Sequence, residues 1–549
     1  MSRREAWLSA GAVFVLALAV RAVIASAIPY PVPEDTAYYV GVARNLVEGH
    51  GLVSDALWSY QTPPLTVPRA AFEIWLPLPT FIAALPMALF GPTFRAAQAG
   101  AVIIGAIVPV LAWRLAANVA GERGLPRGRA RVLALGTGFV ACVYGPLAVH
   151  GALPDSTMPF AALALAACTL MPRLLRDQSP VRSADPRLVG LGILLGLAAL
   201  ARNEAVWLAV TWAALAWWTS PRSLDRRARI RLVAVPAAAA LACYAPWMVR
   251  DWLTFGSPLP GQALANALSV SGFDIFAWQD RPTLARYLAQ GPAWLLGARV
   301  DGLQHNLLDV LLVPAIPAGP IGLAALWWQG RSRAIRPLLV LSVTTFAATT
   351  LAFPVSSEWG TFLHAAGPVH VLLLISCLLF LDASIARIGT WRGWTNPVAW
   401  LGPALVVATA VPVLAISMGS ISGVGVSVRD RYEALDEQLR AAGIDPSAES
   451  PLIVDFPIWA AWSLRVPTLG LPDEDPSSVA DLAHRFGAGL LVITGADHGR
   501  WPGVIGDGGP GAGCFAPLDL PGSATASPAG ASPAGGPLAD TGVYRILCR

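Results

Sequence analysis

The chain has 549 residues and a formal net charge of +4; 55% of its residues are hydrophobic and 13% are charged. A mean hydropathy of +0.57 excludes an ordinary soluble protein, because apolar stretches of about 18–20 residues can cross a bilayer as helices. The small net charge identifies no partner by itself, since the basic residues are all arginine and are segregated by loop.

Eleven apolar stretches are predicted to span the membrane. The first, residues 8–28, follows Arg3 and Arg4, lacks a small-residue cleavage site and leads directly into prolines, so we interpret it as an uncleaved signal anchor. The other spans are expected at 95–117, 132–150, 156–172, 188–202, 204–220, 231–250, 302–328, 337–353, 361–381 and 397–419.

The apolar segment 73–91 is expected to lie at the outer surface, or to dip into it, without crossing. It contains three prolines, and a true crossing would place every later arginine-rich loop on the side opposite Arg3 and Arg4. Without that crossing all these loops share one side, which the positive-inside rule makes the cytoplasm. The loops are 123–131, 173–187, 222–231, 331–336 and 387–392.

The chain is therefore predicted to be a polytopic α-helical membrane protein with about 11–13 transmembrane helices and a C-terminal extracytoplasmic α/β domain. Residues 1–420 would form the membrane domain, with outer loops 29–94 and 251–300, and residues 421–549 the outer domain. Within the outer domain we expect strands at 452–455, 490–494 and 542–547, helices at 429–442 and 476–486, and a flexible Gly/Ala/Ser/Pro-rich insertion at 507–537.

Cysteine usage agrees with this division. Cys514 and Cys548 lie in the polar C-terminal region, where a disulfide would require that region to be outside the cytosol. No CxxC or His-rich pattern indicates a structural metal. The remaining four cysteines are interpreted as small buried apolar residues: Cys142, Cys168, Cys243 and Cys377.

Carboxylates at the outer ends of the spans are the strongest candidates for chemistry. Glu34 and Asp35 precede a short amphipathic helix expected at 36–48, which fits the membrane interface. At that depth either could act as a general base towards a hydroxyl group, or Asp35 could simply cap the helix. Asp155, at the next outer turn, could be a second acid of the same site or the cap of the following span.

A phosphate leaving group would need positive charge, and arginines are scarce on the outer side. Arg69, Arg202 and Arg250 are therefore candidates for phosphate binding, although a span-edge arginine can also extend to the interface. His364 could contact phosphate or sugar, or could be structural. Most of the 21 tryptophans fit an interfacial belt, and Trp75 and Trp359 could stack on sugars.

Four stretches carry a family resemblance: PEDTAYYVGVARNLVEGHG (33–51), APWMVRDWLTFGSP (245–258), EWGTFLHAAG (358–367) and residues 454–495. They resemble bacterial membrane glycosyltransferases of the GT-C class, family 39, which is protein-mannosyltransferase-like and includes transferases that move aminoarabinose onto lipid A. The resemblance covers most of the chain in order.

The resemblance implies that the first-loop acidic pair contains the catalytic base. The family order is usually Asp then Glu, whereas here Glu34 precedes Asp35, which leaves open which residue takes the proton. Many relatives carry Lys or Glu before a later proline-containing segment, where Glu73 is a candidate counterpart and no lysine is present. Glu73, Trp75, Tyr38 and Trp359 are accordingly expected to contact substrate.

The expected activity is an inverting transfer of a sugar from a polyprenyl-phosphate carrier to a hydroxyl on a lipid, glycan or protein. It would occur at the outer face of the cytoplasmic membrane. Asp155 would orient the acceptor or bind a divalent cation, and no other cofactor is expected. No Walker loop, GxSxG, HExxH or nucleic-acid motif occurs. Two alternatives stay open: a flippase or transporter for a lipid-linked glycan, and a non-catalytic envelope scaffold.

Overall fold

The computed structural model describes residues 3–176, 185–219, 225–329, 332–395, 398–495, 498–526 and 536–548. Parts of three expected arginine loops lie outside the described residues, at 177–184, 220–224 and 330–331. Most of the second half of the expected 507–537 insertion, residues 527–535, also lies outside them.

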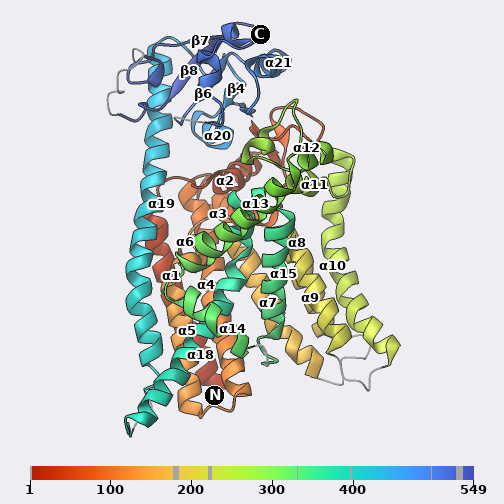
Figure 1. The fold of residues 1–549 in the computed structure, drawn as a ribbon, viewed down its shortest axis with the longest axis vertical. Coiled ribbons are helices and arrows are strands. Elements are labelled where there is room, and N and C mark those ends of the chain that lie inside the picture. Colours follow the sequence, from red (N-terminus) through yellow and green to blue (C-terminus); the bar gives the residue numbers. More distant parts are fainter. Residues whose placement is uncertain are drawn as a thin grey trace.

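A bundle of long helices carries an α/β domain at one end, and the two termini lie at opposite ends of the molecule (Figure 1). Among the described residues, six helices are long and apolar enough to cross a membrane, which makes the chain a multi-pass membrane protein. They are α1 (Arg3–Ala27), α4 (Phe94–Glu122), α7 (Thr157–Arg176), α10 (Arg226–Phe255), α18 (Gly367–Trp391) and α19 (Leu401–Ala441). Shorter helices of the bundle are α3 (Leu78–Phe90), α5 (Arg127–Val143), α6 (Gly145–His150), α8 (Pro186–Ala201), α9 (Ala205–Trp218), α14 (Ala318–Gln329) and α15 (Arg336–Ala352).

Several predicted helices have different boundaries in the structure. The expected spans 132–150 and 361–381 are each divided into two helices, at residue 144 and at residue 366. The expected span 302–328 is wrong as one continuous helix: α13 (Gly291–Gln304) passes into the π-helical turn η2 (His305–Leu312), and α14 begins only at Ala318. Pro314 and Pro317 lie in the interruption, where proline cannot donate the backbone hydrogen bond that a continuous helix requires. The expected helix 429–442 is not separate, because α19 runs without a break from the bundle into the α/β domain.

A second interruption, between α5 and α6, sets up the turn that carries Asp155. Arg21 of α1 is fully buried and donates hydrogen bonds to the carbonyls of Cys142 (3.5 Å) and Leu147 (3.2 Å), on either side of that interruption. Gly151, just after α6, lies so close to α4 that a Cβ on Gly105 would come within 2.6 Å of its Cα. The 150–156 turn is therefore held tightly against α1 and α4.

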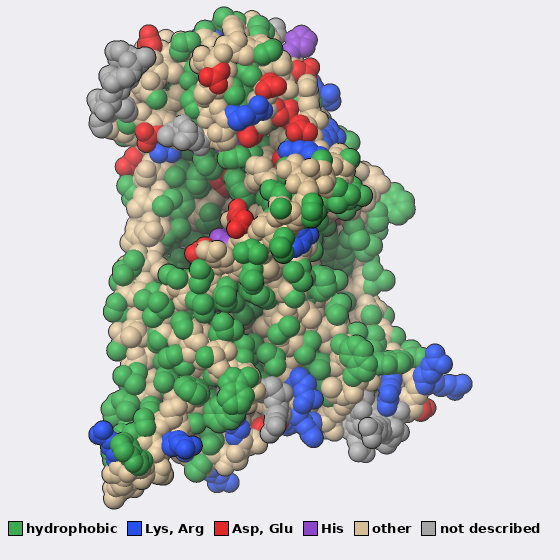
Figure 2. Space-filling view, viewed as in Figure 1, with side chains coloured by type: hydrophobic (Ala, Val, Ile, Leu, Met, Phe, Trp, Pro, Cys, Tyr) green, Lys and Arg blue, Asp and Glu red, His purple; other side chains and the backbone are tan. Residues whose placement is uncertain are grey.

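Charged side chains differ between the two ends (Figure 2). The end that holds the N-terminus carries arginines, a mainly apolar band lies above it, and most acidic side chains lie in the upper part. This distribution agrees with the loop sorting expected from the sequence.

The α/β domain contains a six-stranded sheet in the order β2-β5-β4-β6-β8-β7. Its first four strands are parallel, and β8 pairs antiparallel with both neighbours. The strands are β2 (Ala56–Leu57), β4 (Leu452–Val454), β5 (Thr468–Gly470), β6 (Leu490–Ile493), β7 (Phe515–Pro517) and β8 (Gly542–Ile546), and the helices beside them are α20 (Pro457–Leu464) and α21 (Pro476–Phe486). Because β2 belongs to loop 29–94, the first outer loop and the C-terminal domain share one sheet.

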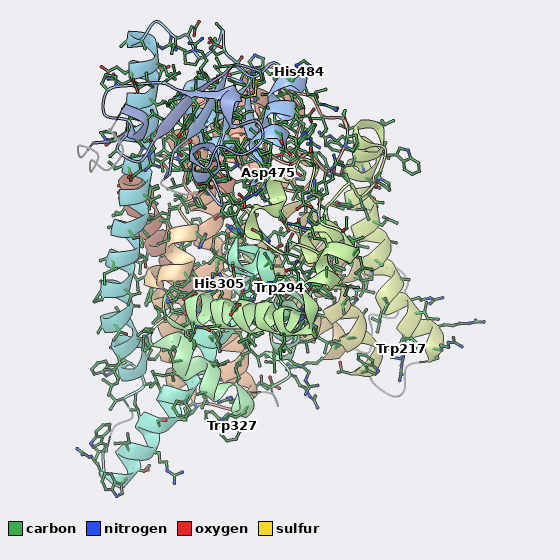
Figure 3. The ribbon with its side chains drawn as sticks, turned by 45° about the horizontal axis from the view of Figure 1, so that its top comes forward. Trp217, Trp294, His305, Trp327, Asp475 and His484 are labelled. Carbon is green, nitrogen blue, oxygen red and sulfur yellow. A yellow bond between two sulfur atoms is a disulfide. The ribbon has the colours of Figure 1, made fainter. Side chains whose placement is uncertain are left out.

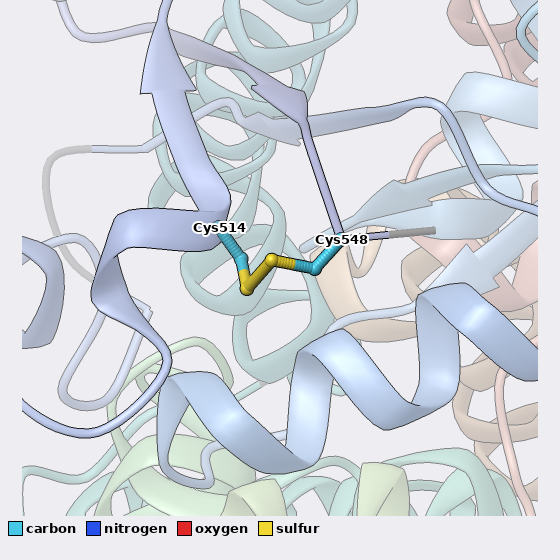
Figure 4. Close-up of a disulfide and its surroundings, with 2 residues drawn as sticks. All are labelled: Cys514 and Cys548. Atoms are coloured by element: carbon cyan, nitrogen blue, oxygen red, sulfur yellow. A yellow bond between two sulfur atoms is a disulfide. The ribbon is translucent and has the colours of Figure 1, made fainter.

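A disulfide between Cys514 and Cys548 joins the segments next to β7 and β8 (Figure 4). The other four cysteines are buried or partly buried, as expected from their apolar surroundings.

The remaining short elements are α2 (Glu34–Val47), β1 (Val53–Ser54), β3 (Arg69–Ala70), α11 (Ala263–Ala267), η1 (Gly272–Phe276), α12 (Leu284–Ala289), α16 (Pro354–Glu358), α17 (Thr361–Ala365), α22 (Gly503–Gly506), η3 (Ala512–Cys514) and η4 (Ala524–Ala526).

Candidate active site

A cavity of about 520 Å³ lies where the outer ends of the helices meet the α/β domain. In Figure 2 the surface is hollowed below the upper domain, and acidic side chains and a histidine lie around the hollow. Its walls come from the start of α2, Trp58, residues 74–76, the 201–204 turn, residues 266–276, η2, residues 355–364 and the start of α20. Segments far apart in sequence therefore converge on one chamber.

Glu34 and Asp35 form the first turn of α2, and both face the cavity. The N-cap residue of this helix is Pro33, and no side-chain hydrogen bond caps the helix. Capping therefore does not account for Asp35. A carboxylate at this position also benefits from the partial positive charge of the helix N-terminus.

A hydrogen-bonded chain connects Asp35 to the interior. Asp35 Oδ2 lies 3.2 Å from His364 Nε2, and His364 Nδ1 lies 2.9 Å from the hydroxyl of Thr157. A proton on His364 Nε2 is donated to Asp35, while Nδ1 forms the hydrogen bond with the Thr157 hydroxyl. These two contacts fix the orientation of the imidazole and of the Asp35 carboxylate.

Asp155 lies next to the same histidine and to a second one, His150. Its Oδ2 lies 2.9 Å from His150 Nδ1 and 3.9 Å from His364 Nδ1, while its Oδ1 accepts the Thr157 backbone N–H at 2.8 Å. Burial alone would raise the pKa of Asp155, but the two histidines and the Thr157 N–H together hold that pKa below its usual value. Asp155 is thus both the cap of α7 and an ionised partner for the imidazoles.

Glu34 has a different environment from Asp35, although the two are adjacent. Its Oε1 accepts the backbone N–H of Ile458 at 3.1 Å, at the start of α20. Burial raises the pKa of Glu34 to about 8, and the neighbouring carboxylates of Asp455 and Asp35 add to the increase. Glu34 is therefore largely protonated at neutral pH, and it connects α2 to the α/β domain.

Arg202 is the single arginine among the described residues that line the cavity. It forms a two-pronged ion pair with Glu204, at 2.8 and 2.9 Å, and donates to Ser156 Oγ at 2.8 Å and to the Thr361 carbonyl at 3.3 Å. These contacts hold the guanidinium rigidly at the cavity wall, close to the turn that carries Asp155.

Five of the expected site residues do not line the cavity, namely Asp155, which lies behind His364, and Tyr38, Arg69, Glu73 and Arg250. Arg69 is buried 3.4 Å from Glu73 and donates to the carbonyls of Ser59 and Thr62, so this pair holds the first outer loop together. Arg250 pairs with Asp251 at 2.9 Å and lies over the ring of Trp247.

Tyr38 accepts the Phe72 N–H at 2.8 Å and packs against Trp75, so it also supports the loop rather than the chamber. Trp75 and Trp359 line the cavity, and their contact with substrate stays a prediction. The sequence interpretation missed further polar residues of the site: His150, Thr157, Glu204, His305, Asp309 and Glu358. His150, Thr157, Glu204 and Glu358 each lie within five residues of a predicted site residue, whereas His305 and Asp309 had no such local signal.

His150, Asp155 and His364 could also hold a metal ion, because their ligand atoms lie within 4.8 Å of one another. Two imidazoles and one carboxylate are a donor set that suits Zn²⁺ or Mn²⁺. In the structure Asp155 Oδ2 bonds to His150 Nδ1, and His364 Nδ1 bonds to the Thr157 hydroxyl.

No protein-family model and no curated protein matches the sequence. Solved structures match the fold. One is the archaeal oligosaccharyltransferase AglB from Archaeoglobus fulgidus, in complex with an inhibitory peptide and a dolichol-phosphate. This likeness covers 90% of the present chain and 70% of that chain, with a TM-score of 0.52 and 13% identity. Oligosaccharyltransferases of this kind have the GT-C fold. The chain therefore has a GT-C fold, and the fold expected from the resemblance is confirmed.

ArnT from Cupriavidus metallidurans matches over nearly the whole length. Its apo structure covers 100% of this chain and 99% of that chain, with a TM-score of 0.53 and 15% identity. The structure bound to undecaprenyl phosphate covers 97% of each chain, with a TM-score of 0.50 and 14% identity. At such identities the likeness defines the fold, and the activity has to be argued from the site.

Proposed function

We propose that this protein is an inverting glycosyltransferase that moves a sugar from a polyprenyl-phosphate carrier to a hydroxyl acceptor at the outer face of the cytoplasmic membrane. The observation that carries the proposal is an Asp35 carboxylate held by His364 in a cavity at the membrane-domain boundary. Support also comes from the GT-C fold, shared with structures bound to undecaprenyl phosphate or dolichol-phosphate.

The assignment of the base to Asp35 rests on the contrast with Glu34. A general base must be ionised and able to reach the acceptor proton. Glu34 directs one oxygen to Ile458 and has a pKa raised to about 8, whereas Asp35 faces the chamber beside a histidine that can donate to it. Glu34 is accordingly a positioning residue that fixes α2 against α20.

In the proposed reaction Asp35 accepts the proton of the acceptor hydroxyl. The acceptor oxygen bonds to the anomeric carbon from the side opposite the phosphate, while the bond between that carbon and the phosphate oxygen breaks. The polyprenyl phosphate leaves as an anion, and the configuration at the anomeric carbon is inverted. No nucleotide is needed, because the leaving phosphate is already a stable anion.

Arg202 is the proposed contact for the departing phosphate, because it brings a guanidinium to the cavity wall. Arg69 and Arg250 are left out of this role, since both are engaged in the surrounding loops. If a divalent ion is used, His150, Asp155 and His364 would hold it, and it would supply further positive charge for the phosphate.

The N-terminus would lie in the cytoplasm and the α/β domain outside it, as the arginine-rich end of the bundle indicates. A flippase that transports a lipid-linked glycan would move labelled lipid across the bilayer without forming a bond. A scaffold would do neither.

The test is transfer from a radiolabelled polyprenyl-phosphate sugar by the full chain in proteoliposomes, supplied with envelope extracts as acceptor. Asp35→Asn should lower the rate about 10²–10⁴-fold, the usual contribution of a general base. Asp436→Asn, an exposed carboxylate on α19 paired with Arg440, is the matched control and should retain full activity. Full activity of Asp35→Asn would refute the assignment, and lipid movement without transfer would favour the flippase.

A further inference from the structure

We infer that the acceptor is an uncharged saccharide, recognised at the mouth of the cavity by a group of residues that we call the rim subsite: His305, Asp309, Glu358 and Trp359. This inference rests on the proposed transferase activity and adds the chemical class of its acceptor.

Trp359 is built as a flat platform for a ligand ring. It is 45% exposed although it lines the cavity, and its indole lies against the backbone of Gly272. Phe273 and Phe276 meet it edge-on, with ring centroids 6.0 and 6.2 Å away. These neighbours fix the plane of the indole while one part of it stays open, which suits the C–H face of a sugar ring.

Polar groups for hydroxyl recognition surround this platform. Asp309 pairs with His305 at 3.2 Å, and both project from η2, while Glu358 immediately precedes the platform residue. Carboxylates accept hydrogen bonds from sugar hydroxyls, and the imidazole can donate or accept. Asn266 and Ser271 line the same cavity and add neutral donors and acceptors.

Charge then excludes anionic acceptors. Five acidic side chains line the cavity: Glu34, which is largely protonated, and Asp35, Glu204, Asp309 and Glu358. Arg202, the single arginine of the described lining, is assigned to the donor phosphate, and Asp309 and Glu358 are exposed. A phosphorylated or carboxylated acceptor would meet like charges as it enters, whereas a neutral saccharide would meet hydrogen-bond acceptors.

The rim subsite adjoins the segment that contacts Asp35, the proposed catalytic base. Glu358 and Trp359 belong to the connection between α15 and α18 that continues to Thr361 and His364. His364 contacts Asp35, and Thr361 receives a hydrogen bond from Arg202. A saccharide stacked on Trp359 can therefore present a hydroxyl to Asp35 without leaving the same chamber.

The test is binding of the full chain in lipid nanodiscs to an array of neutral saccharides, phosphorylated and uronic-acid saccharides, and hydroxyl-bearing peptides. Binding should be confined to neutral saccharides, and Trp359→Ala should weaken it about tenfold, while Trp359→Phe should weaken it less because a ring remains. Trp327→Ala is the matched control, since Trp327 is 86% exposed near the far end of α14 (Figure 3), and it should bind normally.

A second variant reverses the charge at the mouth. Asp309→Arg combined with Glu358→Arg should admit phosphorylated saccharides, with binding about tenfold stronger than in the native protein. Binding only to anionic saccharides or peptides, no binding to any saccharide, or native binding by Trp359→Ala would each overturn the inference.

These failures differ from failure of the proposed function. Asp35-dependent transfer to a peptide or to a charged lipid would remove the saccharide acceptor and leave the transferase standing. Saccharide binding that persists in Asp35→Asn while transfer stops would support both.

Discussion

Glu34→Gln should change how the stability of the protein depends on pH. The pKa of Glu34 is raised from its ordinary value of 4.5 to about 8, mainly by burial. A carboxyl that keeps its proton in the folded state but loses it in the unfolded chain makes folding weaker as pH rises. Gln cannot ionise, and its side-chain oxygen can still accept the Ile458 N–H.

These two pKa values give the direction of the pH dependence and the pH range in which it occurs. The stabilisation from Glu34 is complete below about pH 4.5, decreases as pH rises, and is fully lost above about pH 8. Between these limits the free energy of unfolding of the native protein should fall by up to about 1.4 kcal/mol per pH unit relative to Glu34→Gln. The slope cannot exceed this value, because a single proton distinguishes the folded from the unfolded state at this group.

The assay is chemical unfolding of the full chain in mixed micelles, followed by tryptophan fluorescence at intervals from about pH 5 to 9. Glu433→Gln is the control: this carboxylate is largely exposed on α19, and its substitution should leave the native pH dependence unchanged. Parallel pH profiles for the native protein and Glu34→Gln would refute the raised pKa of Glu34.

Two further perturbations test other parts of the structure. Arg202→Lys should lower the transfer rate about tenfold to a hundredfold, because lysine cannot reproduce the two-pronged pair with Glu204. Steady-state kinetics would detect this loss, with Arg299→Lys as the control. An unchanged rate in Arg202→Lys would contradict the role of Arg202 in phosphate binding. Replacing Cys514 and Cys548 together by Ser opens a crosslink between residues 34 apart and should cost about 4 kcal/mol of unfolding free energy. An unchanged unfolding midpoint would contradict that expectation.

Hydropathy predicted most of the bundle, because the length of an apolar stretch is a local property. The interruptions were harder to predict, since proline does not settle the question by itself. Pro109 lies inside α4, whereas Pro314 and Pro317 lie in a true break before α14. Neighbouring helices decide which prolines a helix tolerates, and no local pattern records those neighbours.

The candidate site shows the same division. Asp35 and Asp155 could be identified because each stands at the outer end of a predicted span. Their connection through His364 depends on packing between distant segments. The pairing of β2 with β5 depends on such packing too, because β2 is an edge strand of two residues with no sequence signature of its own. The pair of Arg69 and Glu73 had no such local clue, because a spacing of four residues brings side chains together on a helix, whereas Arg69 lies in β3 and Glu73 in a loop.

The shared sheet has a consequence for biogenesis. Asp55 accepts the backbone N–H of Thr468, and Glu34 accepts that of Ile458, which lies 424 residues later in the chain. Ribosomes deliver the amino-terminal acids to the membrane long before the strand and helix that complete their surroundings are translated. The chamber is consequently among the last features to mature, because its walls are complete only after the carboxyl-terminal strand and helix have been translated.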